Sequence, residues 1–89
     1  MSENLNNTMK YDGFQEQELS MSEVIRIVYR ALKERGYEPE NQIVGYILSG
    51  DPTYITSHND ARKLVRQVER DDLLAAILKS YIENEKIAE

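Results

Sequence analysis

The sequence predicts a mainly α-helical fold, a compact bundle of about four short helices behind a disordered N-terminal tail. Three observations support this. Apolar residues recur at helical spacing in several segments, Gly and Pro stand where helices should end or begin, and residues 60–86 contain neither Gly nor Pro. With 89 residues the chain is one domain at most. We divide it into a flexible acidic tail, 1–19, and a helical domain, 20–86.

The composition excludes several classes of protein. There is no Cys, so disulfides and thiolate metal sites are excluded and a reducing cytoplasm is expected. Sixteen acidic residues against eleven Lys and Arg give a net charge of -5, which opposes binding to nucleic acid. The longest uncharged stretch, 41–50, is too short to span a membrane, and the polar N-terminus does not resemble a signal peptide.

The first 21 residues have the composition of a mobile tail. They hold one cation, Lys10, against four acidic residues, and their few apolar residues follow neither helical nor alternating spacing. Thr8 would be accessible to a kinase in such a tail. On the residues alone, however, an unmodified threonine is the better interpretation.

A first helix is predicted to begin after Ser20, which forms a capping box with Glu23. It should end at Gly36, because a residue without a Cβ adopts the left-handed conformation at no cost. Between them, one apolar stripe repeats at 3.6-residue spacing, while Arg26, Arg30, Lys33 and Glu34 face water. The stripe consists of Val24, Ile25, Val28, Ala31 and Leu32.

A second helix of about ten residues is predicted from Pro39, a favoured first residue, to Gly50. Ile43, Val44, Ile47 and Leu48 share one side by their spacing, while Gly45 and Tyr46 leave the rest of its surface uncharged too. After Asp51-Pro52, residues 53–56 alternate between β-branched and aromatic side chains. This pattern predicts one short strand.

The last segment forms either one long helix or two, and a break is favoured. Ser57 and Asn59 are candidate N-caps. The apolar stripe of Ala61, Leu64, Val65 and Val68 would continue at position 72, where Asp72 stands. We therefore predict a break near 69–72, with Asp71 or Asp72 capping a final helix. Its apolar residues are Leu73, Leu74, Ile77, Leu78, Tyr81 and Ile82.

No set of residues predicts an enzyme, a metal site or a cofactor. His58 is the single histidine, and there is no Gly-rich phosphate loop to hold a nucleotide. Arg62, Arg66 and Arg70 recur at i, i+4 and i+8, which would stack three guanidinium groups on one helical face. Such a face is either solvated or grips an anionic partner, and spacing alone favours the first. A small nucleic-acid-binding regulator remains the alternative class.

Three segments resemble one known family. GYEPENQIVGYILSGDPTYI (36–55), HNDAR (58–62) and ERDDL (69–73) are similar to the IreB family of small regulatory phosphoproteins of low-GC Gram-positive bacteria, and NTMKY (7–11) resembles its phosphoacceptor segment. The resemblance implies a cytoplasmic homodimer without catalytic activity. It implies phosphorylation of Thr8 by a transmembrane Ser/Thr kinase that senses the cell wall, reversed by a cognate phosphatase.

The resemblance also implies a role and a set of partner-binding residues. Members act on peptidoglycan synthesis and cell-wall antibiotic tolerance, in some cases by controlling proteolytic turnover of a precursor-synthesis enzyme. Arg62, Arg66 and Arg70 fall where the family has basic residues important for activity. Thr56-Ser57 replaces a Pro-Arg pair that the family often has, and Asn4 and Leu5 stand near the place of a second Thr found in some members, which leaves Ser2 open as a further phosphoacceptor.

We interpret the uncharged second helix as part of a homodimer interface. Its inner side would pack on the chain's own core, and Gly45 beside Tyr46 would let a partner backbone approach on the other. The predicted interface residues are Ile43, Gly45, Tyr46 and Ile47. Phosphate on Thr8 would then change how the arginine face meets its partner, either by drawing the tail onto that face or by repelling an acidic partner.

Overall fold

The computed structural model describes residues 19–88. Four α-helices follow one another: α1 (Met21–Glu34), α2 (Pro39–Ser49), α3 (Ala61–Val65) and α4 (Arg70–Asn84). Two single turns of 3-10 helix, η2 (Pro52–Tyr54) and η3 (His58–Asp60), connect α2 to α3. The helical fold class is therefore confirmed, while the tail prediction for 1–18, including Thr8, falls outside the described residues.

Helix α1 begins and ends as its sequence predicts. The backbone N–H of Ser20 donates to Glu23 Oε1 at 2.8 Å, and the Glu23 N–H donates to Ser20 Oγ at 3.1 Å, which completes the capping box. At the other end Gly36 adopts a φ of 84°, and the Tyr37 N–H reaches back to the Leu32 carbonyl at 2.9 Å. The cap and the glycine together fix both ends of the central helix.

The core lies between α1 and the segments that surround it. Four residues of the α1 stripe are fully buried, and α3 and α2 pack against this helix. Tyr46 of α2 and Ile55 of the loop complete the core with two residues of α3. The buried residues are Val24, Val28, Ala31, Leu32, Tyr46, Ile55, Ala61 and Val65. We call this unit, residues 21–65, the body.

The predicted strand at 53–56 is wrong. Asp51 caps a 3-10 turn instead, because its Oδ1 accepts hydrogen bonds from the Thr53 hydroxyl at 2.7 Å and the Thr53 N–H at 3.0 Å. No strand occurs between 19 and 88. Of residues 53–56, only Ile55 is buried in the core. The local Asx hydrogen bonds prevailed over β-propensity because no neighbouring strand offers a ladder.

The final segment does divide into two helices, but earlier than predicted. Helix α3 ends at Val65, the chain turns through 66–69, and α4 begins at Arg70 with Glu69 at its N-cap. Asp71 and Asp72 lie inside the first turn of α4, so neither is the predicted cap, and Asn59 has a positive φ of 55° rather than a capping conformation. The carboxylates still favour this helix end through the helix dipole.

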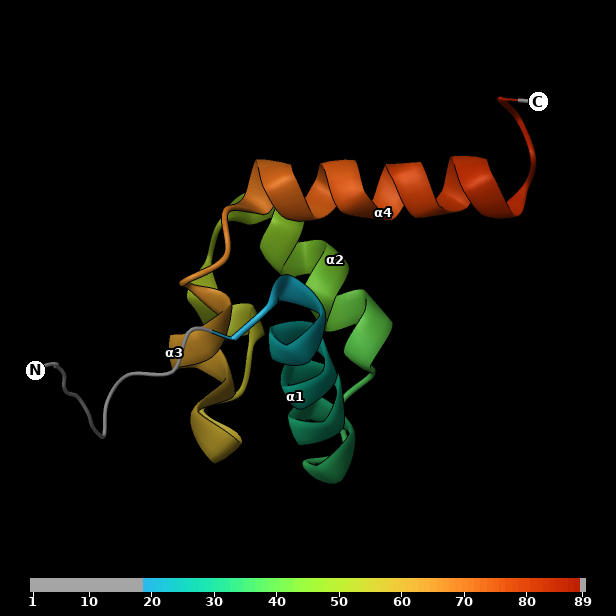
Figure 1. The fold of residues 1–89 in the computed structure, drawn as a ribbon. Coiled ribbons are helices and arrows are strands. Elements are labelled where there is room, and N and C mark those ends of the chain that lie inside the picture. Colours follow the sequence, from blue (N-terminus) through green and yellow to red (C-terminus); the bar gives the residue numbers. More distant parts are fainter. Residues whose placement is uncertain (1–18, 89) are drawn as a thin grey trace, which may run out of the picture.

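Helix α4 extends away from the body as an arm. Figure 1 shows it crossing above α1 and α2, with its C-terminal half beyond the other helices. Leu73 is its one buried residue, whereas Leu74, Ile77, Leu78 and Tyr81 are exposed. We call residues 70–84 the arm.

Candidate functional site

The arm is attached to the body by few contacts. Leu73 reaches the body with 4% of its surface exposed, and Arg70 Nη1 donates to the Ile47 carbonyl at the end of α2 at 2.9 Å. Gly50 makes room for this arginine, since a Cβ there would lie 2.8 Å from the Arg70 guanidinium carbon. Gly50 therefore serves both the left-handed end of α2, with a φ of 75°, and the seat of the arm.

The three arginines do not form the predicted face of one helix. Arg62 Nε donates to the Ile55 carbonyl at 2.8 Å, Arg70 donates to the Ile47 carbonyl, and the helix is broken between Arg66 and Arg70. Arg66 lies at the C-cap of α3 and is exposed. Arg62 thus holds the loop at Ile55, and Arg70 joins the arm to the end of α2. The stacked arrangement expected from an unbroken helix is wrong.

The predicted dimer residues lie mostly against the chain's own core. Tyr46 is 6% exposed, and a Cβ on Gly45 would lie 2.5 Å from the ring of Tyr54, so that ring already occupies the surface beside the glycine. Ile43 also packs against the core. Gly45 and Tyr46 therefore lie on the inner side of α2, whereas the sequence placed them on the outer side. The exposed apolar residues of α2 are Val44 and Leu48.

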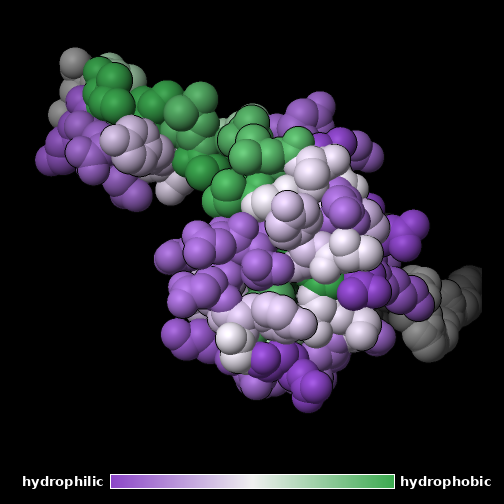
Figure 2. All heavy atoms as spheres, turned by 180° about the vertical axis from the view of Figure 1, so that it is seen from behind, coloured by the Kyte–Doolittle hydropathy of each residue, from purple (hydrophilic) through white to green (hydrophobic). Residues whose placement is uncertain are grey.

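Within residues 19–88, apolar side chains are exposed on both sides of the arm. On the α2 side, Ile47 and Leu74 line a hollow together with three charged residues, Glu69, Arg70 and Asp71, and the spacing of the neighbouring exposed apolar residues continues along both helices. Figure 2 shows hydrophobic residues following the arm to the body. We define the α2–α4 surface as Val44, Ile47, Leu48, Leu74, Leu78 and Tyr81.

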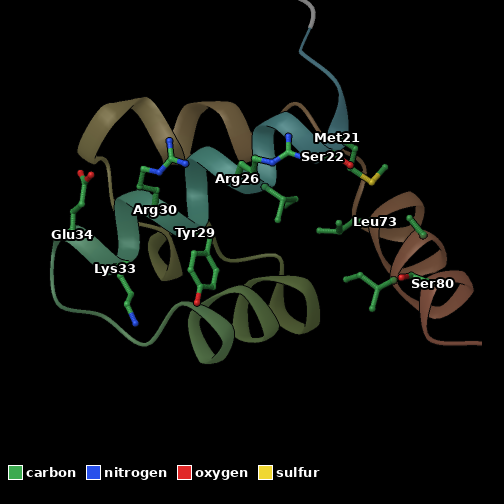
Figure 3. A pocket seen from close by; sticks show the side chains of 12 residues that line it. Met21, Ser22, Arg26, Tyr29, Arg30, Lys33, Glu34, Leu73 and Ser80 are labelled. Carbon is green, nitrogen blue, oxygen red and sulfur yellow. The ribbon is translucent and has the colours of Figure 1, made fainter. Parts of the chain in front are cut away.

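On the other side, a groove of about 780 Å³ lies between α1 and the arm. Its apolar lining comes from Ile25 and Tyr29 of α1 and from Leu73, Ala76 and Ile77 of α4. Three cations, Arg26, Arg30 and Lys33, and one carboxylate, Glu34, stand along its α1 side. Figure 3 shows Arg26 and Arg30 projecting in the same direction from α1, whereas Tyr29 and Lys33 project to the opposite side of the helix.

The carboxylates near this groove are already engaged. Glu34 Oε1 lies 2.8 Å from His58 Nε2, which ties the end of α1 to η3. The Ser20 backbone N–H, and after it the Ser20 hydroxyl and the charge of Arg26, lower the pKa of Glu23 from its ordinary value. Within 19–88, Arg26, Arg30 and Lys33 make no ion pair. The groove is therefore apolar inside and cationic along one edge.

Sequence reasoning missed this groove because it interpreted Arg26, Arg30 and Lys33 as the solvated side of α1. One signal was present. The apolar residues of α4 occupy two sides of the helix: Leu73 and Ile77 lie on one side, and Leu74, Leu78 and Tyr81 lie on the other. A single contact with a small body cannot cover both sides. Elsewhere in 19–88, no three side chains gather in a way that would hold a metal ion, and none of the helices is long and apolar enough to cross a membrane.

Fold and site together define a small helical protein in which a compact body carries an extended arm with exposed apolar residues. The family model for "IreB regulatory phosphoprotein" matches residues 6–83. A "UPF0297 protein" of Acetivibrio thermocellus is 58% identical over 78 residues, which cover 88% of this chain and 87% of the relative. A second "UPF0297 protein", of Ruminiclostridium cellulolyticum, is 54% identical over 80 residues, which cover 90% of this chain and 91% of the relative. The chain belongs to the IreB family of regulatory phosphoproteins.

Proposed function

We propose that the chain is a non-enzymatic, cytoplasmic regulatory phosphoprotein that is phosphorylated on Thr8 by a transmembrane Ser/Thr kinase and dephosphorylated by a cognate phosphatase. Through protein–protein contacts it controls peptidoglycan synthesis and tolerance of cell-wall antibiotics, in part through proteolytic turnover of a precursor-synthesis enzyme. The observation that carries this proposal is the family match, because residues 6–83 contain both Thr8 and the whole helical body.

Intact-mass spectrometry of the protein from its own cells, with fragmentation to locate the phosphate, tests this function. The expected result is one phosphate on Thr8 that is lost in Thr8→Ala and rises when the phosphatase is removed. A Ser2→Ala variant is the matched control and should keep the phosphate. A phosphate confined to residues outside the N-terminal segment would overturn the assignment.

The working form that we propose is a homodimer joined through the α2–α4 surface. Large apolar side chains are exposed on this surface: Leu48 is 79% exposed and Leu78 is 56% exposed. Contiguous exposed apolar residues of this kind are typical of protein–protein contacts. In a two-fold symmetric dimer, a second copy would offer the same surface, so that the arm of each protomer would cover the α2–α4 surface of the other. This interface keeps Ile47 of the predicted one and leaves out Ile43, Gly45 and Tyr46, which pack within the body.

Sedimentation over a wide range of protein concentration tests the dimer. The double variant Leu74→Ser/Leu78→Ser should shift the protein to a monomer, because each change removes about 1.5–3 kcal/mol of apolar burial per protomer. Tyr37→Ser is the control, since Tyr37 is 50% exposed but lies on the loop between α1 and α2. A monomer in the unmodified protein at every concentration would contradict the dimer.

The downstream protein partner is proposed to bind around Arg66. This arginine is exposed, while Arg62 and Arg70 are engaged with backbone carbonyls and act as positioning residues for the surface beside it. Arg66→Glu should abolish the regulatory effect on cell-wall antibiotic tolerance without changing the fold. An unchanged effect in cells that carry stable Arg66→Glu protein would exclude this surface.

A further inference from the structure

We propose that the groove between α1 and the arm is the docking site of this chain's own N-terminal segment, residues 1–18. The cationic edge of Arg26, Arg30 and Lys33 would hold its acidic residues, and phosphate on Thr8 would strengthen the contact. The phosphate step rests on the proposed function, whereas the docking of the segment does not.

Charge and polarity of the two partners are complementary. The segment carries Glu3, Asp12, Glu16 and Glu18 against Lys10. The groove carries three cations against one carboxylate, Glu34, whose Oε1 lies 2.8 Å from His58 Nε2. Between its charges the segment also has apolar side chains that match the lining from α1 and α4, namely Leu5, Met9, Tyr11 and Phe14. An acidic segment with apolar anchors therefore fits an apolar groove with a cationic edge.

The segment also joins the body where the groove begins. Met21 and Ser22 line the groove, and Leu19, the last residue before the cap, packs against the core. Thr8 precedes Leu19 by eleven positions, a separation that spans up to roughly 36–40 Å when the chain is extended. Met21 to Arg30 covers only about 14 Å of helix. A chain that doubles back along α1 thus brings Thr8 beside Arg26 and Arg30 with length to spare.

Arg26 and Arg30 suit a phosphate better than the rest of the edge. They lie one turn apart on α1 and project in the same direction in Figure 3. Two guanidinium groups at that spacing can share the oxygens of one phosphate dianion through charge-assisted hydrogen bonds. Without the phosphate the segment would be held by weaker, salt-sensitive contacts.

The chain's lack of Cys offers a clean test by paramagnetic NMR. A spin label on Met9→Cys in the full chain should broaden the amide signals of Tyr29, Arg30, Ala76 and Ile77. Mixing labelled protein with an excess of unlabelled, isotope-free protein leaves this effect unchanged if each segment docks on its own copy. Adding Thr8→Glu should increase the broadening, and high salt should reduce it.

Arg26→Glu/Arg30→Glu should abolish the broadening, and Arg35→Glu is the matched control. Arg35 is an exposed cation at the end of the same helix but does not line the groove. Broadening that persists in the double variant would overturn the proposal. So would groove signals that shift with concentration alone, because a second copy would then fill the groove. Neither result depends on phosphate, so mass spectrometry of Thr8 judges the proposed function separately.

Discussion

Helices α1 and α4 are nearly equal in length, 14 and 15 residues, yet one is the centre of the body and the other is an exposed arm. Helix α1 buries four apolar residues, whereas α4 buries only Leu73. The difference lies in how the apolar residues are distributed. In α1 they form one stripe that one layer of neighbours can cover, while in α4 they occupy two sides. The apolar stripe of α1 is therefore covered within one chain, whereas the arm leaves several large apolar side chains exposed.

The largest expected effect separates these two helices directly. Leu32→Ala should lower the free energy of unfolding by about 2–5 kcal/mol, because Leu32 is 0% exposed and its loss leaves a cavity. Leu78→Ala on the arm should change it by less than about 0.5 kcal/mol in the monomer. Urea unfolding at low protein concentration measures both.

The comparison sharpens when the same measurement is repeated at high concentration. There Leu78→Ala should become destabilising if the proposed dimer forms, since a second copy that covers the arm would add to the stability of the unmodified protein. Equal losses for Leu32→Ala and Leu78→Ala at the lowest concentration would show that the arm is part of the core, contrary to the structure.

The second prediction concerns the contact that covers the middle of α2. Gly45→Ala gains about 1 kcal/mol of helix propensity but places a Cβ 2.5 Å from the Tyr54 ring, and such overpacking costs about 1–3 kcal/mol. A net destabilisation of about 1 kcal/mol is expected. In the Tyr54→Ala background the same change should instead stabilise, because the ring that it meets is absent. Destabilisation in both backgrounds would contradict this contact.

Local signals in the sequence predicted the helices of the body well. The Ser20–Glu23 box, Pro39 and the two left-handed glycines act over a few residues and hold in the structure. The sides of α2 were not predictable, because its apolar residues surround the helix and Gly45 is explained only by Tyr54, nine residues further on. The groove likewise depends on the direction of the arm, which a hydrogen bond from Arg70 to a distant carbonyl helps to set.

A third prediction tests that hydrogen bond at the root of the arm. Arg70→Met removes the donor to the Ile47 carbonyl and should cost about 1 kcal/mol of stability, with the arm losing order before the body. Arg66→Met is the matched control and should have an effect near zero, because Arg66 is exposed and makes no side-chain hydrogen bond within 19–88. Hydrogen exchange of the α4 amides reports the difference residue by residue. Unchanged exchange in Arg70→Met would show that Leu73 alone orients the arm.

The smallest expected effect is a dependence on pH at the start of α1. The Ser20 backbone N–H, with the Ser20 hydroxyl and Arg26, holds the pKa of Glu23 below its ordinary value of 4.5 in the folded protein. A carboxyl group with a lowered pKa stabilises the fold above its unfolded pKa, and this contribution is lost as the pH falls through the folded value. The first turn of α1 should therefore loosen below about pH 4.5.

NMR titration of the Ser20 and Glu23 amides follows this loosening, and Glu23→Gln is the control that removes the titrating group. In that variant the pH dependence of the first turn should disappear. The turn at Asp51 should keep its pH dependence, because hydrogen bonds from the Thr53 hydroxyl and N–H lower the pKa of the Asp51 carboxyl. Because Leu19 packs on the core just before this cap, a loosened first turn also frees the entry to the groove.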